Sequence, residues 1–214
     1  MVEEPQSEYQ KLPSQHPQPK PMTLEEYWVF EYNAEERHEY HDGTLIEMNY
    51  TSEPHGQICS NLTGLIFNCI REKDCSVYAE NRMVYIPECN KNFYPDVLIV
   101  CGKHELKAVK KNMHATMNPS VIIEVLSNTT EDFDKTKKTK CYKKIRSLQQ
   151  LIFIRQDEKN IRILNRTDKD RVWIEIEAFD DDETVEIGDC TLSVKDIYHR
   201  IEIIDNTPER ASDK

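Results

Sequence analysis

The chain has 214 residues, of which 38% are hydrophobic and 31% charged, and its formal net charge is −11. This composition suits a globular protein with a polar surface, and no apolar run approaches the ~20 residues that a membrane-spanning helix needs. A strongly acidic chain is a poor general binder of nucleic acid unless its positive charge is concentrated locally.

Three segments differ in composition. Residues 1–21 hold five of the ten prolines and few apolar side chains, which predicts a disordered N-terminal arm. We expect residues 22–204 to form a single domain and the polar residues 205–214 to form a flexible tail. The N-terminus does not show the charged-then-apolar pattern of a signal peptide.

The seven cysteines include no CxxC pair, so their spacing predicts neither a disulfide framework nor a zinc ribbon. Cys59, Cys69 and Cys101 lie in apolar stretches and are predicted to be small core residues. This cysteine usage fits a reducing cytosol, and we therefore predict a cytoplasmic location.

The N-terminal half contains both helix and strand signals. Thr23, followed by acidic residues, predicts a helix start, and His41-Asp42-Gly43 predicts a hairpin turn. Apolar residues at three- and four-residue spacing predict an amphipathic helix over 55–73. Three strands should follow, with an irregular loop over 87–94 and a polar insert over 102–118. These strands are Cys75–Glu80, Arg82–Ile86 and Asp96–Cys101.

The C-terminal half begins with Val121–Leu126, a nearly continuous apolar run that predicts a central strand buried on both faces. A helix is expected over Phe133–Arg146 and a short closing helix over Val194–Arg200. The remaining predicted strands are Leu151–Ile154, Asn160–Leu164, Val172–Glu177, Thr184–Ile187 and Thr191–Leu192. Together these elements predict an α/β (α+β) fold in which helices flank a mixed sheet.

Two acidic residues stand where a buried strand should be apolar. Asp96 opens one apolar strand and Glu124 lies inside another. Because an unpaired buried carboxylate is costly, such groups pair with a cation or bind a metal. A carboxylate pair on adjacent strands suits Mg²⁺. The alternatives are a salt bridge from Glu124 to a helix lysine and a turn cap by Asp96 after Pro95.

The order Tyr94-Pro95-Asp96 and then Ile123-Glu124-Val125-Leu126 resembles the PD-(D/E)XK nuclease superfamily, and in particular its Uma-type family of restriction-endonuclease-like proteins. The resemblance covers residues 23–201. Four segments carry it: His38–Gly43, His55 with the helix after it, Pro95–Val97, and Asn118–Ser127 together with Thr130, Asp134, Lys138 and Tyr142. Leu126 stands where the superfamily has a lysine, and Lys138 corresponds to the lysine that the Uma-type family carries on the next helix.

The resemblance implies a restriction-endonuclease-like fold and an endonuclease that hydrolyses DNA with Mg²⁺, or alternatively Mn²⁺. Asp96 and Glu124 would hold the metal, joined by the backbone carbonyl of Val125. Lys138 would be the catalytic cation, and Glu39 would complete the site. A homodimer is possible, since two-fold symmetric cutting needs two copies.

Positive charge is concentrated over residues 131–146, which hold seven basic and three acidic side chains. We predict DNA contacts from Lys135, Lys137, Lys140 and Lys144. The alternative is that these lysines form an ordinary solvated helix face.

Three other interpretations remain open at this stage. His38, His41 and His55 could gather near Glu39 as a transition-metal site. The chain could be a catalytically inactive nuclease-fold module for binding or interaction, given Leu126 and the net charge. It could also be a small structural or regulatory protein that does not contact nucleic acid.

Overall fold

A computed structural model describes residues 21–48, 50–126, 138–169 and 172–203. The predicted arm, apart from Pro21, and the predicted tail lie outside these residues. The predicted helix over 133–146 is described only from Lys138 onward. Within the described residues, no helix is long and apolar enough to cross a membrane.

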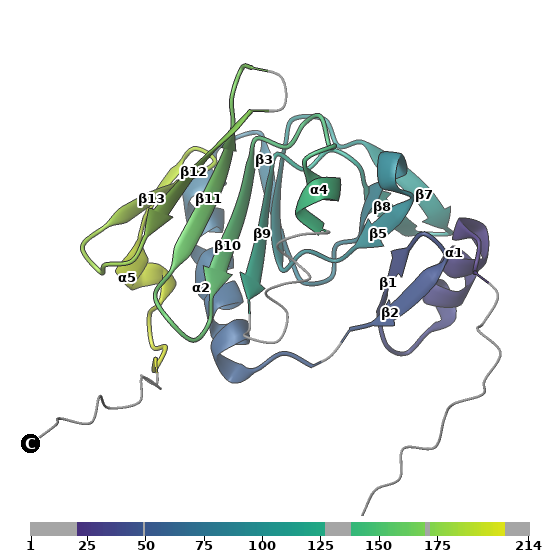
Figure 1. Ribbon diagram of the computed structural model, residues 1–214, viewed down its shortest axis with the longest axis horizontal. Coiled ribbons are helices and arrows are strands. Elements are labelled where there is room, and N and C mark those ends of the chain that lie inside the picture. The colour runs from purple at the N-terminus through teal and green to yellow at the C-terminus, as the bar shows by residue number, and fades with distance from the viewer. Residues whose placement is uncertain (1–20, 49, 127–137, 170–171, 204–214) are drawn as a thin grey trace, which may run out of the picture.

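Two mixed sheets dominate the fold (Figure 1). The first, sheet A, has the order β2-β1-β5-β4-β8-β7, with β4 and β8 parallel and the other pairs antiparallel. Its strands are β1 (His38–His41), β2 (Thr44–Glu47), β4 (Val84–Ile86), β5 (Lys91–Phe93), β7 (Leu106–Lys110) and β8 (Met113–Thr116).

The second, sheet B, has the order β12-β11-β10-β9-β6-β3, with β9 and β10 parallel and the other pairs antiparallel. Its strands are β3 (Cys75–Ala79), β6 (Val97–Cys101), β9 (Val121–Leu126), β10 (Gln150–Arg155), β11 (Ile161–Arg166) and β12 (Trp173–Ala178). A separate hairpin consists of β13 (Thr184–Ile187) and β14 (Cys190–Ser193).

Helices cover both faces of sheet B. One face packs against α2 (Glu53–Ile70) and α5 (Val194–Ile197), and the other lies under α4 (Thr139–Tyr142) (Figure 1). Helix α1 (Leu24–Asn33) packs beside sheet A, and its predicted start at Thr23 is confirmed by a capping box with Glu26.

Strand β9 is the centre of this arrangement. All six of its residues are buried. Val121, Ile123 and Val125 enter the core formed with α2, whereas Ile122 and Leu126 enter the core formed with Tyr142. The continuous apolar run is therefore explained by burial on both faces, as predicted.

The hairpin turn at Asp42-Gly43 is also confirmed. Both residues have positive φ angles, 49° and 101°, which a tight two-residue hairpin turn requires. A side chain at Gly43 would place its Cβ 2.8 Å from the Cβ of Pro21, so this position also needs glycine for space.

Three expectations about secondary structure were wrong. The fold has two six-stranded sheets where one was expected. The predicted loop over 87–94 forms the 3₁₀ helix η1 (Pro87–Cys89) and strand β5, and the predicted polar insert forms the β7–β8 hairpin. Strand β7 is mostly exposed, so its sequence lacks the apolar alternation that marks a half-buried strand.

The cysteines pair across the fold. Disulfides join Cys69 to Cys190, Cys75 to Cys101 and Cys89 to Cys141. The prediction that Cys69 and Cys101 are core thiols was wrong, whereas Cys59 is a buried free thiol as predicted. The partners are 121, 26 and 52 residues apart, so local spacing gave no sign of them.

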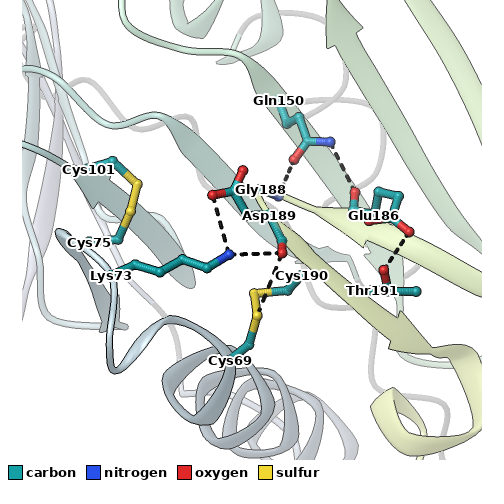
Figure 2. Close-up of a disulfide and its surroundings, with 10 residues drawn as sticks. All are labelled: Cys69, Lys73, Cys75, Cys101, Gln150, Glu186, Gly188, Asp189, Cys190 and Thr191. Atoms are coloured by element: carbon teal, nitrogen blue, oxygen red, sulfur yellow. Dashed lines mark hydrogen bonds and ion pairs between the residues drawn. A yellow bond between two sulfur atoms is a disulfide. The ribbon is translucent and has the colours of Figure 1, made fainter.

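The Cys69–Cys190 bond joins the end of α2 to β14 (Figure 2). Beside it, Lys73 Nζ lies 3.1 Å from the Asp189 carbonyl oxygen and 3.3 Å from its carboxylate. The Gln150 side chain accepts a hydrogen bond from the Gly188 N–H at 2.6 Å. The β13–β14 hairpin is thus attached to both α2 and sheet B.

This pairing predicts a thiol count. Denatured without reductant, the protein should show one thiol to a colorimetric thiol reagent, and the native protein should show none. Cys59 is buried, and burial raises the pKa of its thiol, which suppresses the reactive thiolate. Reduction should lower the unfolding free energy by about 2–5 kcal/mol for each bond removed. Seven reactive thiols after denaturation would show instead that the cysteines are unpaired.

Candidate active site

Asp96 and Glu124 lie next to each other across two paired strands. Val97 of β6 pairs with Ile123 of β9 in antiparallel register, and Asp96 and Glu124 are the next residues along each strand. The Asp96 carboxylate also accepts a 2.7 Å hydrogen bond from the backbone N–H of Val125. Strand pairing thus holds both acids at one end of the β6–β9 ladder.

Glu124 is a deeply buried carboxylate, with 4% of the residue exposed. The Tyr142 hydroxyl donates a 2.6 Å hydrogen bond to Glu124 Oε1, and Lys138 Nζ lies 3.9 Å from the same oxygen. Both partners come from the segment that forms α4. The alternative of a salt bridge from Glu124 to a helix lysine therefore describes part of the observed geometry.

Lys138 is the cation of this cluster. Its residue is 8% exposed, and its Nζ lies 2.8 Å from Glu39 Oε1 and 5.6 Å from the centre of the Phe93 ring. Glu39 of sheet A, which was predicted to complete the site, thus contacts Lys138, and Lys138 lies near Glu124. Asp96 lies opposite Glu124 in the strand register, and its carboxylate contacts His55 and the Val125 N–H.

Glu39 is also held by His41, whose Nε2 lies 2.9 Å from Glu39 Oε2. Burial raises the pKa of the Glu39 carboxyl, but Lys138 and His41 outweigh that effect and hold this pKa below its ordinary value. The site therefore contains an ionised Glu39 beside a buried ammonium group.

His55 contacts one of the paired acids. From α2 its Nε2 lies 3.3 Å from Asp96 Oδ1, and its Nδ1 lies 3.7 Å from the Cys59 sulfur. Burial lowers the pKa of His55, but Asp96, Glu80 and the Val125 backbone together raise it above its ordinary value. Ligand atoms of His55, Cys59 and Asp96 lie within 4.8 Å of one another, yet the two ring nitrogens of His55 face different partners.

The alternative in which His38, His41 and His55 gather near Glu39 is not what the structure shows. Of these three, His41 is the one that contacts Glu39, whereas His38 pairs with Glu31 at 3.2 Å and His55 pairs with Asp96.

Sequence reasoning considered His41 and His55 only as ligands of a transition-metal site and assigned no role to Tyr142, although all three lie in the segments that carry the resemblance. The signal that could have found Tyr142 is its position four residues after Lys138, which places both on one helix face.

A cavity of about 230 Å³ opens beside Asp96. Its lining includes Glu35, Glu36 and Glu80 and one basic residue, Arg37. This predominantly acidic lining favours the accumulation of cations next to Asp96.

Two of the four lysines predicted to contact DNA, Lys140 and Lys144, are exposed on or just after α4. The other two, Lys135 and Lys137, lie outside the described residues.

The buried ion pair makes a prediction that does not depend on activity. Lys138→Met should lower the unfolding free energy by about 3–5 kcal/mol, because it leaves Glu39 buried without its cation. The double variant Lys138→Met/Glu39→Gln should lose less than the sum of the single variants by about 1 kcal/mol or more. Urea unfolding measures both.

The matched control is Lys195→Met, since Lys195 is exposed on α5, and this change should stay within about 0.5 kcal/mol. Strict additivity of the Lys138 and Glu39 variants would contradict the coupling.

Comparison with known proteins supports the fold. A crystal structure of a putative nuclease belonging to DUF820 from Anabaena variabilis matches with a TM-score of 0.64 and 18% identity, over 83% of this chain and 98% of that chain. The predicted fold class, an α+β nuclease-like fold, is therefore confirmed.

Two proteins of Synechocystis sp. are related in sequence. The uncharacterized protein sll1609 is 29% identical over 169 residues, which cover 79% of this chain and 94% of that protein. The uncharacterized protein slr1290 is 28% identical over 158 residues, which cover 74% and 80% respectively.

The family model Uma2, described as "Putative restriction endonuclease", matches residues 24–195. This range contains Glu39, Asp96, Glu124 and Lys138 and most of both sheets. The chain therefore belongs to the Uma2 family.

Proposed function

We propose that this protein is a metal-dependent endonuclease that hydrolyses phosphodiester bonds of DNA. One observation carries the proposal: Asp96 immediately precedes β6, Glu124 lies in the paired strand β9, and the buried ammonium group of Lys138 lies 3.9 Å from the Glu124 carboxylate. The membership in the Uma2 family and the likeness to the putative nuclease from Anabaena support it.

The donor set fits a small divalent cation. Asp96, Glu124 and the backbone carbonyl of Val125 would supply oxygen ligands, which Mg²⁺ and Mn²⁺ prefer. When bound, the metal would lower the pKa of a water and polarise a phosphoryl oxygen. His55 contacts both Asp96 and the Val125 backbone and so would orient two of the proposed donors.

Lys138 would stabilise the negative charge that develops on the phosphoryl group or orient the attacking water. Glu39 holds its ammonium group at 2.8 Å, and the hydroxyl of Tyr142 orients the neighbouring carboxylate of Glu124. The Lys138 ammonium also lies against the aromatic ring of Phe93. These contacts preorganise the cation, so little reorganisation is needed during the reaction.

Because the whole chain is acidic, DNA would approach this site only where basic side chains are concentrated. We assign this contact to Lys135, Lys137, Lys140 and Lys144, of which the structure describes the last two. The homodimer stays a prediction.

The cytoplasmic location is also a proposal, and it conflicts with the three disulfides, because such bonds persist in oxidising compartments. A thiol count on the denatured protein distinguishes a reduced, cytoplasmic protein from a disulfide-bonded protein of an oxidising compartment.

A second candidate is a catalytically inactive nuclease-fold module that binds nucleic acid. Two observations favour it. Lys138 is already neutralised by Glu39 at 2.8 Å, and Leu126 is a core residue where the superfamily has a lysine.

Cleavage of supercoiled DNA with Mg²⁺ or Mn²⁺ tests the endonuclease proposal. Asp96→Asn and Glu124→Gln should each lower the cleavage rate by on the order of 10²–10³-fold, because each removes charge from the proposed metal site. Lys138→Met should lower it by a similar factor. Chelation of the metal should abolish cleavage by the unmodified protein.

The matched control is Asp74→Asn, which changes an exposed acid just before β3 and should cleave like the unmodified chain. If metal and DNA give no cleavage, or if Asp96→Asn cleaves normally, the endonuclease proposal fails. DNA binding that calorimetry finds without any metal binding would then favour the inactive module.

A further inference from the structure

A large basic cavity lies beside α4. Its volume is about 880 Å³, and we call it the α4 cavity. It is lined by five cationic side chains, one acid and one aromatic ring: Lys140, Lys143, Lys144, Arg146, Arg166, Glu88 and Trp173. In a chain of net charge −11, this is a marked local concentration of positive charge.

Helical spacing explains why the α4 cavity and the acids lie on different sides of one segment. Lys138 and Tyr142 are four residues apart and both face Glu124. Lys140 is three and four residues from Lys143 and Lys144, and these three share the face that lines the cavity. Helical hydrogen bonds continue past Tyr142, with the Lys143 N–H donating to Thr139 and the Ile145 N–H to Tyr142.

The contacts of these cations leave their charge available. Arg166 donates to the backbone carbonyls of Leu148, Lys143 and Ile145 at 2.6, 3.1 and 2.7 Å. Lys144 donates to the carbonyl of Glu88 at 3.2 Å. A carbonyl satisfies the hydrogen bond but does not cancel the positive charge as a carboxylate would.

Trp173 of β12 contacts two of the cavity's cations. The Arg166 guanidinium lies 4.6 Å and the Lys143 ammonium 5.3 Å from the ring centre. Burial lowers the pKa of Lys143, with Glu175 acting in the opposite direction. A bound anion would compensate for the desolvation of this ammonium group.

We propose that the α4 cavity binds backbone phosphates of the nucleic-acid strand, a few nucleotides from the phosphate that is cut. The inference rests on the proposed function and extends it, because it assigns Lys143, Arg146 and Arg166 to substrate binding and makes Trp173 part of the site. Lys144 lies six residues after Lys138, about 9 Å along a helix axis at ~1.5 Å per residue. Phosphates along one strand of a duplex advance by about 3.4 Å. A strand that ran along this segment would therefore place in the cavity phosphates about two or three positions from the site of cleavage.

The test measures binding without cleavage. Fluorescein-labelled 20-nucleotide DNA, single-stranded or duplex, is titrated with the full chain in chelator at low salt, and anisotropy is recorded. The variant Lys140→Gln/Lys143→Gln/Lys144→Gln should weaken binding to the better ligand about tenfold or more. It should also reduce the slope of log affinity against log salt, by about 0.9 for duplex or about 0.7 for single-stranded DNA, for each phosphate that the variant no longer neutralises. Arg166 is kept, because its carbonyl contacts hold the chain after α4 in place.

The control variant is Lys73→Gln/Lys159→Gln/Lys195→Gln, which changes the net charge equally but removes lysines outside the cavity lining. It should bind within about twofold of the unmodified chain, because distant charges are screened. Equal weakening by both variants, or no weakening by the cavity variant, would overturn the proposal. So would an absence of DNA binding at low salt, or displacement of the DNA by inorganic phosphate at equal phosphate concentration.

Trp173 offers a second readout, since the chain has only one other tryptophan, Trp28. DNA should change the fluorescence of the unmodified chain, and Trp173→Phe should remove most of that change.

Failure of the endonuclease proposal would look different from failure of the cavity proposal. A protein that binds DNA through the α4 cavity but never cleaves it would contradict the endonuclease proposal and support the cavity proposal. A protein that cleaves normally without the three lysines would contradict the cavity proposal.

Discussion

The carboxylate of Glu124 lies in the middle of β9, a strand that is buried on both faces. Placing an unpaired charge there would cost several kcal/mol, so its stability depends on the groups around it. Tyr142 donates a hydrogen bond at 2.6 Å and Lys138 contributes a positive charge at 3.9 Å. Lys138 is itself buried and is held by Glu39 of sheet A. A series of polar side-chain contacts therefore connects the centre of sheet B through α4 to sheet A. Its groups depend on one another, because removing any one leaves a buried charge behind.

This dependence makes α4 the element through which the two sheets are connected at the site. One of its faces carries Lys138 and Tyr142, and the other carries lysines of the α4 cavity. The Cys89–Cys141 disulfide ties the same helix to η1, which precedes β5 of sheet A. Phe93 of β5 contacts both the Tyr142 ring and the Lys138 ammonium. Ionic, covalent and apolar contacts thus all fix α4, and a shift of this helix would alter the acid pair and the cavity together.

The sequence predicted the parts of this arrangement that leave a local signal. Glu124 stands out as an acid within a β-branched run, and Asp96 as an acid at the start of another apolar strand. Lys138 has no such signal, and only the family resemblance distinguished it from its neighbouring lysines. The contact of Glu39 with Lys138 depends on how sheet A packs against α4, which no pattern in either segment reports. The same holds for Arg166 and Trp173, whose strands follow α4 in the chain but line the cavity beside it. Strand β5 was missed because Lys91-Asn92-Phe93 is short and polar, and it forms by pairing with β1 and β4.

The net charge of −11 at first argues against a nucleic-acid substrate, but the position of the charges matters more than their sum. Charges separated by more than about 8 Å in physiological salt are largely screened. A bound strand would therefore respond mainly to the cations of the α4 cavity. The acidic cavity beside Asp96 would act separately and raise the local concentration of divalent cations. The two cavities differ in charge, because the one that Asp96 lines is predominantly acidic and the α4 cavity is basic. Under the proposed function, this difference would let an acidic protein bind a metal and a polyanion on separate surfaces, because each would be attracted by the surface of opposite charge.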